Sequence, residues 1–184
     1  RTRALIRGEI ERFARDTPFF DVPLVGFASA SDPLFLQYKK IIGDFHLTPG
    51  EFFAKAFGTD LSAGTVICWI LPVSGKARLS NRDETRWPSV EWARVRTHGE
   101  AFNNRLRKHL VAFLEGSGHR ALSPVFSTEW KQFESTPVGI ASSWSERHAA
   151  YAAGLGTFSL NDGLITEKGI AHRCGSVITD LLLS

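Results

Sequence analysis

Residues 143–179 read SWSERHAAYAAGLGTFSLNDGLITEKGIAHRCGSVIT, and this stretch says most about the fold. Ser143 stands three residues before Glu146, which is the spacing of a capping box at a helix start. The pattern therefore predicts a helix that runs through Ala153. Small and polar residues alternate with apolar ones after that point, and this favours a segment that lies against a large ligand.

Two glycines, Gly154 and Gly156, end the predicted helix. Arg147, Tyr151 and Gly154 follow one another at i, i+4 and i+7, so they share one stripe of that helix. Glycine at a helix end allows a left-handed backbone and lets another group come close. By itself this pattern indicates an ordinary helix cap.

A polar turn and a strand follow the glycines. Residues 163–166 resume apolar character, and residues 169–179 have a strand pattern in which Arg173 and Ser176 stand among small residues. Backbone donors beside glycines, with an arginine and an asparagine nearby, suit a ligand that carries amides or phosphate, such as a flat macrocycle. The polar turn consists of Thr157, Ser159, Asn161 and Asp162.

The rest of the chain mixes helical and strand patterns irregularly, which favours an α/β fold of the α+β sandwich type over a regular doubly wound sheet. Residues 65–73, TVICWILPV, are nearly all apolar and predict a strand buried on both faces. The other expected strands are 22–30 and 121–126; the expected helices are 5–14, 34–42, a short one opened by Pro49, and 89–113, with a possible break at Gly99; residues 76–88 are expected to form a loop.

Composition bounds the function. The chain has 184 residues, 43% of them apolar, and a net charge of +3, which fits a single globular domain, 1–184. Basic residues are scattered, so nucleic acid is not the leading partner. The sequence contains neither a signal peptide nor an apolar run of about 20 residues, so we expect a cytoplasmic protein without a membrane span.

The two cysteines, Cys68 and Cys174, form no CxxC motif, and the six histidines have no metal-ligand spacing. Cys68 lies in the apolar strand and is expected to pack as a small hydrophobic residue. Arg173 would lower the pKa of Cys174 if both faced a pocket, although a packed thiol is the better expectation. No P-loop, GxGxxG, GxSxG or HExxH motif occurs.

The sequence holds no methionine and begins with Arg1. It ends in ITDLLLS, in the middle of a strand pattern. We expect a piece of a longer protein, or a sequence from which methionines have been lost.

The order of residues in the C-terminal stretch, from Ser143 onward, resembles the central segment of epoxyqueuosine reductases and corrinoid-dependent reductive dehalogenases. The resemblance is strong over about residues 143–184 and weaker upstream, at VGFASA and TVICWILPVS; an uncharacterised ferredoxin-like iron–sulfur branch of the superfamily is a closer match still. The residues that match are Glu146, Arg147, Gly154, Leu155, Gly156, Asn161, Gly169, Arg173, Thr179, Asp180 and Leu181.

This resemblance implies a nitroreductase-like, cobalamin-binding-type domain and an oxidoreductase. In the family, a domain with two iron–sulfur clusters follows the segment that ends at Leu181. Four-cysteine cluster sites need ligands that this sequence lacks. The resemblance therefore implies the N-terminal, corrinoid-binding part of a reductase whose 4Fe-4S clusters belong to an absent C-terminal domain or to a ferredoxin.

The resemblance also implies a small-molecule or modified-nucleoside substrate and a set of corrinoid contacts. Gly154, Gly156, Thr157 and Asn161 would lie near the macrocycle or its amides. Arg173 and Ser176 would contact its side chains or nucleotide tail. With Arg147 and Tyr151 on the helix stripe, eight residues make up the expected cofactor-binding set.

One departure from the family concerns the proton donor. Epoxyqueuosine reductases carry an acid about six positions before the Glu-Arg pair, whereas residues 138–141 here read VGIA. Tyr151, Glu146 and His148 remain as possible donors, and the sequence does not choose among them.

Two alternatives stay open. Nitroreductase-like folds often hold FMN, so a flavin-dependent reductase is one, although the early Arg/Ser-rich phosphate pattern is missing. The other is an interaction module that kept the fold and lost its cofactor.

Overall fold

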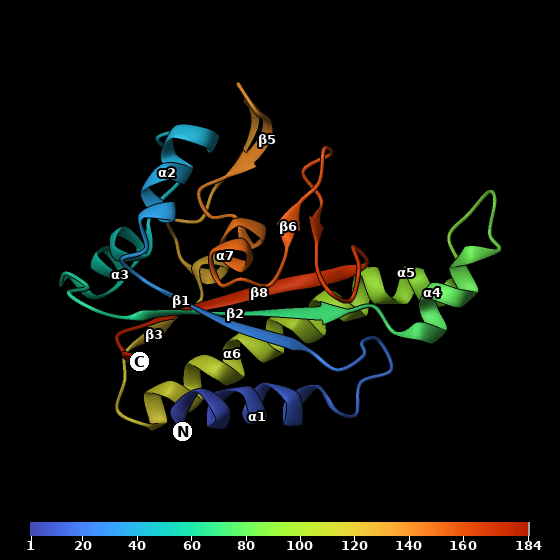
Figure 1. Cartoon of the computed structure of the whole chain (residues 1–184), viewed down its shortest axis with the longest axis horizontal. Coiled ribbons are helices and arrows are strands. Elements are labelled where there is room, and N and C mark those ends of the chain that lie inside the picture. The colour runs from blue at the N-terminus through green and yellow to red at the C-terminus, as the bar shows by residue number, and fades with distance from the viewer. Residues whose placement is uncertain (184) are drawn as a thin grey trace.

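The computed structural model describes residues 1–183 and places an antiparallel sheet at the centre of the molecule (Figure 1). The strand order is β1-β2-β8-β3, so the last strand of the chain lies inside the sheet. Each neighbouring pair is antiparallel. The strands are β1 (Leu24–Ser29), β2 (Thr65–Pro72), β3 (Ala121–Leu122) and β8 (His172–Thr179).

Helices cover both faces of this sheet, as expected for an α/β sandwich. α1 (Thr2–Ala14) and α6 (Glu100–Gly116) pack on one face, where Trp69 belongs to the same core. On the other face, α2 (Pro33–Ile42), α3 (Pro49–Phe57) and α7 (Glu146–Ala152) surround Trp144. The two apolar cores share the sheet between them.

Strand β2 is buried along its whole length, which confirms the expectation from its apolar sequence. Its side chains alternate between the two cores: Ile67 and Trp69 face α1 and α6, whereas Val66 and Cys68 face the other helices. Burying one such side chain stabilises the fold by about 1.5–3 kcal/mol. Cys68 is fully buried, so its expected packing role is confirmed.

Local signals predicted two helix starts correctly. The Asp32 carboxylate accepts a hydrogen bond from the Leu34 backbone N–H at 2.9 Å and caps α2. Thr48 and Glu51 form a reciprocal capping box at the start of α3. Such caps stabilise a helix by about 1 kcal/mol because they satisfy otherwise free backbone N–H groups.

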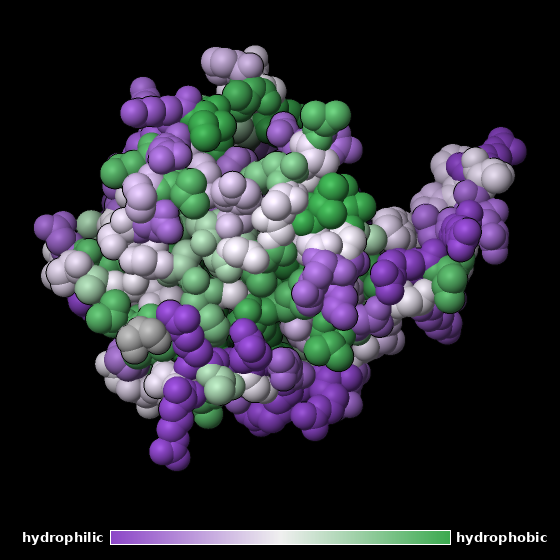
Figure 2. Space-filling model, in the orientation of Figure 1, coloured by the Kyte–Doolittle hydropathy of each residue, from purple (hydrophilic) through white to green (hydrophobic). Residues whose placement is uncertain are grey.

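The expectation of a loop over 76–88 was wrong for its first half. α4 (Gly75–Arg82) is a helix whose Ser74 hydroxyl accepts a hydrogen bond from the Ala77 backbone N–H. Only Ala77 is buried within α4, so the helix shows no apolar periodicity for a sequence reading to detect. Figure 2 shows α4 and the loop after it as a polar arm that projects from the body.

The long helix expected from Ser89 is continuous but changes its winding before Gly99. It begins as α5 (Val90–Arg94), passes through a π-helical turn, η1 (Val95–Gly99), and continues as α6. A Cβ atom at Gly99 would crowd the ring of Phe20. The helix therefore packs on Phe20 at the position where a break was expected.

The strand expected at 121–126 is much shorter. β3 has two residues and is followed by a 3-10 turn, η2 (Pro124–Phe126), because Pro124 cannot donate to a strand ladder. Two small hairpins complete the fold, and neither was predicted as a hairpin; Thr157, expected in the polar turn, lies in a strand of the second. They are β4 (Gln132–Thr136) with β5 (Gly139–Ser142), and β6 (Thr157–Phe158) with β7 (Leu164–Ile165).

The helix start at residue 143 was also placed wrongly. Ser145, not Ser143, caps α7, and its hydroxyl accepts from the His148 backbone N–H. Ser143 instead donates its hydroxyl hydrogen to the Glu129 carbonyl and accepts from Lys131 N–H, both at 2.9 Å. Ser143 therefore joins the β4–β5 segment to α7, and Glu146 is left free for another partner.

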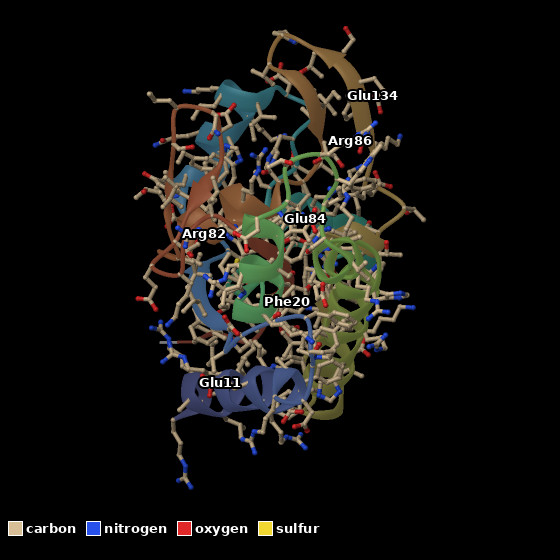
Figure 3. The ribbon with its side chains drawn as sticks, turned by 90° about the vertical axis from the view of Figure 1, so that its right-hand side faces the viewer. Glu11, Phe20, Arg82, Glu84, Arg86 and Glu134 are labelled. Atoms are coloured by element: carbon tan, nitrogen blue, oxygen red, sulfur yellow. The ribbon has the colours of Figure 1, made fainter. Side chains whose placement is uncertain are left out.

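The β4–β5 hairpin and α1 lie at opposite ends of the molecule, as Glu134 and Glu11 show in Figure 3. Arg82, Glu84 and Arg86 mark the arm between them and are exposed. Within residues 1–183, no helix combines the length and the apolar character that crossing a membrane requires.

Candidate functional site

A groove opens along the edge of β8 and has a volume of about 680 Å³. Its walls come from α6, β8, the start of α7 and the β4–β5 hairpin, with Trp130 and Trp144 as its aromatic residues. We call it the β8 groove. A second hollow of about 350 Å³ adjoins it and shares Trp130, Ser145 and Arg147. The charged and titratable residues that line the β8 groove are Glu100, Arg107, Glu146, Arg147, His172, Arg173 and Cys174.

The β8 groove exists because one edge of β8 is only partly paired. β8 pairs with β2 over its whole length but with β3 only at Ile178 and Thr179. The Cys174 carbonyl accepts hydrogen bonds from Asn103 Nδ2 at 2.8 Å and Arg107 NH2 at 2.9 Å. Backbone groups alternate sides along a strand, so those of His172 and Ser176 point to the same edge. The groove floor therefore presents backbone donors and acceptors.

A buried arginine organises the wall of the groove. Arg107 is 3% exposed and forms ion pairs with Glu100 at 2.8 Å and Glu146 at 3.4 Å. Arg173 reaches the other oxygen of Glu100 at 3.5 Å. Breaking such a buried network by removing one partner is strongly destabilising, because it leaves a charge without compensation. The network therefore fixes the relative positions of α6, α7 and β8.

Glu146 is incompletely satisfied in this network. Its Oε2 atom is buried and makes no hydrogen bond among the described residues, and the same is true of Arg107 Nε. Burial raises the pKa of Glu146, and nearby Glu100 raises it too, whereas Arg107, Ser176 and Trp144 lower it. The net direction is upward, which favours the neutral acid.

Cys174 lies half-buried in the same wall. Burial raises the pKa of this thiol to about 12, and Glu146 contributes in the same direction. Arg147 and Arg107 lower it by less. The expected packed thiol therefore agrees with the structure, because burial outweighs the effect of the neighbouring arginines on the Cys174 pKa.

Two histidines hold the start of α7. His46 Nε2 accepts a hydrogen bond from Ser145 N–H at 3.1 Å, and the Ser145 hydroxyl lies 2.8 Å from His148 Nδ1. Burial lowers the pKa of each histidine to about 4. Tyr38 donates to the His148 carbonyl at 3.0 Å. Both imidazoles are therefore neutral at pH 7 and position Ser145 beside the groove.

The eight residues expected to bind a cofactor do not lie in one place. Arg147 and Arg173 line the β8 groove. Ser176 is buried beside it and accepts a hydrogen bond from Trp144 Nε1 at 3.0 Å. Gly154 and Gly156 line a different hollow, of about 440 Å³, together with Arg7, Glu11 and Glu167. We call this the Gly154 cavity.

The other three residues line neither the β8 groove nor the Gly154 cavity. Tyr151 is exposed and packs against the ring of Phe158, with ring centroids 5.6 Å apart. Thr157 is exposed on β6. Asn161 caps the turn between β6 and β7, where its Oδ1 accepts from Gly163 N–H at 3.1 Å.

Sequence reasoning missed the α6 side of the groove, Glu100 and Arg107 above all. A signal for Arg107 was present: Asn103 and Arg107 stand one turn apart, on the side of α6 that also buries Leu106 and Leu110. A buried arginine is almost always paired, so a polar residue within an apolar stripe indicates a buried network. Within residues 1–183, no group of three or more His, Cys, Asp or Glu residues is placed to hold a metal ion.

Comparison with known proteins gives a fold. No family model and no curated protein matches the sequence. Two solved structures share the fold at 16% identity. One is epoxyqueuosine reductase from Bacillus subtilis with its catalytic loop swung out of the active site, with a TM-score of 0.55. The other is a selenomethionine-labelled epoxyqueuosine reductase, with a TM-score of 0.53.

These matches cover 98% of this chain but only 46% and 47% of the two reductase chains. The chain thus spans about half the length of the solved structures that it matches. At this identity the likeness concerns the fold alone. The fold of residues 1–183 is that of part of an epoxyqueuosine reductase.

Proposed function

We propose that this chain is a corrinoid-binding domain of a reductase and that the corrinoid binds in the β8 groove. The observation that carries the proposal is the groove itself. It combines two tryptophans, three arginines and a partly unpaired strand edge, on a fold shared with epoxyqueuosine reductases. Ligand sites typically pair an apolar lining with a few well-placed polar groups.

The groove residues suit the chemistry of a corrinoid. Its rim carries carboxamides, which need both donors and acceptors, and its nucleotide tail carries a phosphate. The backbone N–H and carbonyl of His172, on the β8 edge that lines the groove, offer both kinds of partner to amides. Arg147 and Arg173 provide the positive charge that a phosphate requires.

The β8 groove is large enough to enclose part of a corrinoid but not all of it. Drug-sized ligands occupy pockets of about 300–1,000 Å³. A corrinoid is larger than such ligands, so the groove and the adjoining hollow would cover one side of it. The opposite side would face a substrate or another protein domain.

A bound corrinoid would supply low-valent cobalt, which carries the electron-transfer chemistry. The residues of the chain would bind and orient it: Trp130 by apolar contact, Arg147 and Arg173 by charge. Glu146 and Arg107 would set the electrostatics of the wall.

Iron–sulfur clusters would provide the electrons. The two cysteines of the sequence are too few for a four-cysteine site, so the clusters would belong to another domain or to a ferredoxin. The names of the matching structures make a modified nucleoside the first substrate to consider. We propose the cytoplasm as the location of the reaction, as expected from the sequence.

Titration with hydroxocobalamin tests the proposal, with the visible spectrum and calorimetry as readouts. We expect saturable binding that weakens at least about tenfold in Arg173→Ala, because a hydrogen bond to a charged group contributes about 1.5–3 kcal/mol. Arg7→Ala, in the Gly154 cavity, is the control and should bind as the wild type does. Absence of binding at high micromolar cobalamin would contradict the proposal.

A parallel titration with FMN separates the alternatives. Tight FMN binding without cobalamin binding would favour a flavin-dependent reductase. Binding of neither cofactor would favour the interaction module.

A further inference from the structure

Two acidic residues, Glu100 and Glu146, line the β8 groove. The contacts of Glu146 within the fold leave one of its carboxyl oxygens without a hydrogen bond among residues 1–183. Its partner Arg107 lies closer to Glu100, at 2.8 Å, than to Glu146, at 3.4 Å. Two carboxyl groups therefore compete for one buried guanidinium group, and the more distant one is the less stabilised as an anion.

The surroundings of Glu146 decide its charge. α6 contributes Glu100 and Arg107, β8 contributes Cys174 and the Ser176 hydroxyl, and Arg147 is the next residue on α7. β2 contributes Cys68, a thiol that burial keeps neutral. Arg107 is thus the one cation paired with Glu146 among the described residues, and it also pairs with the Glu100 carboxylate. The thiols of Cys68 and Cys174 are neutral and add no positive charge near Glu146.

The other candidate donors fit the β8 groove less well. Tyr151 is exposed, packs against Phe158 and does not line the β8 groove. The Nδ1 atom of His148 is already engaged by the Ser145 hydroxyl, and burial lowers the pKa of His148 to about 4, so it carries no spare proton at pH 7. Glu146 alone among the three lines the β8 groove.

We propose that Glu146 is the proton donor of the β8 groove and gives its carboxyl proton to a substrate that is reduced there. This inference rests on the proposed reductase function. Two electrons from the reduced corrinoid would give an uncharged substrate two negative charges, which two protons neutralise. The O–H bond of Glu146 breaks, its proton goes to the reduced atom, and the electron pair stays on the carboxylate.

Arg107 explains why this acid can give up its proton. The carboxylate left on Glu146 faces the guanidinium group at 3.4 Å, which stabilises the new charge. The second proton comes from water, which also returns a proton to Glu146 through the open groove. Burial thus favours the neutral acid before the reaction, and Arg107 limits the cost of its ionisation.

The protonation of Glu146 can be tested without any cofactor, by denaturation of the wild type and Glu146→Gln over a range of pH. Burial raises the folded-state pKa of Glu146 above its ordinary 4.5, so the folded wild type holds a proton that the unfolded chain loses. Wild-type stability relative to Glu146→Gln should therefore fall as the pH rises above about 4.5. A rise over the same range would mean an ionised Glu146 and would overturn the proposal.

Glu9→Gln is the matched control. The Arg12 hydrogen bond lowers the pKa of Glu9, a buried carboxyl on the other face of the sheet. Wild-type stability relative to Glu9→Gln should therefore rise as the pH rises towards about 4.5 and then stay level above that pH, where the Glu146→Gln comparison falls. Infrared spectra at pH 7 should also show a protonated carboxyl band that Glu146→Gln removes and Glu9→Gln keeps.

Contact with the ligand is tested by calorimetry of cyanocobalamin binding in two buffers with different ionisation enthalpies, between pH 6 and 9. A ligand in the groove desolvates Glu146 further and raises its pKa. At a pH in this range at which free Glu146 is partly ionised, binding should therefore take up more protons in the wild type than in Glu146→Gln. Equal uptake in both at every pH of the range would overturn the proposal. If cyanocobalamin does not bind, the reductase proposal fails, whereas the denaturation series still reports the charge of Glu146.

Discussion

The β8 groove and the Gly154 cavity lie on different parts of the fold and are built on different principles. The β8 groove has a buried arginine, an unsatisfied carboxyl and an open strand edge in its walls. The Gly154 cavity is lined by Arg7 and Glu167, which are exposed, and by glycine backbone. Burying a charge costs free energy of desolvation, and buried ionisable groups are common at functional sites. The β8 groove is therefore the better functional candidate of the two.

The largest expected effect concerns Arg107. Arg107→Ala removes the buried partner of Glu100 and Glu146 and one of the two donors to the Cys174 carbonyl, so we expect a loss of about 3–5 kcal/mol in the free energy of unfolding. Chemical denaturation measures this loss. Arg7→Ala removes an exposed side chain that reaches the Val25 carbonyl at 3.3 Å, and should cost no more than about 0.5 kcal/mol. Equal losses would remove the distinction between the two sites.

The second-largest expected effect is a loss in the free energy of unfolding at acidic pH, caused by His46, which holds the start of α7 beside the β8 groove. Burial lowers the pKa of His46 from 6.5 to about 4, so the unfolded chain binds a proton that the folded protein does not. Stability should therefore fall as the pH drops from about 6.5 towards 4, by roughly 2–3 kcal/mol for this residue. His46→Asn should show a flatter pH profile in denaturation experiments. An unchanged slope would mean that His46 does not titrate in this window.

The smallest effects come from the glycines of the Gly154 cavity. A Cβ atom at Gly156 would clash with the Ile165 carbonyl oxygen, so Gly156→Ala should cost about 1–3 kcal/mol. Gly154 has φ +73 and open space around its Cα, so Gly154→Ala should cost about 1 kcal/mol from backbone strain. If neither substitution changes the affinity for cobalamin, these glycines are needed for the backbone turn after α7 and not for ligand binding. A large loss of cobalamin affinity in Gly154→Ala, whose added Cβ meets no neighbouring atom, would move the site to that cavity.

Local patterns in the sequence predicted much of the fold. The apolar run of β2, the caps Asp32 and Thr48, and the apolar stripe of α1 are short-range signals, and each led to the observed element. α4 was missed because it buries only Ala77. The start of α7 was misplaced because Ser143 satisfies the spacing of a capping box while tertiary contacts engage its hydroxyl.

The candidate site was harder to predict, because its walls come from distant segments. Arg173 and Arg147 were found within one stretch, yet their neighbours Glu100 and Arg107 lie about seventy residues apart from Arg173 and belong to a separate helix. Short-range patterns cannot report such contacts. The same stretch also joins residues of two sites: Gly154 and Arg173 are close in sequence but line different cavities.

Hydrogen exchange with and without hydroxocobalamin tests the central claim most directly, since it reports where on the chain a bound corrinoid lies. We predict slower exchange at residues 142–147 and 172–176, which form the wall and the open edge of the β8 groove. Exchange at 154–157 should not change. Protection confined to 154–157, or none anywhere at a saturating concentration, would contradict the account.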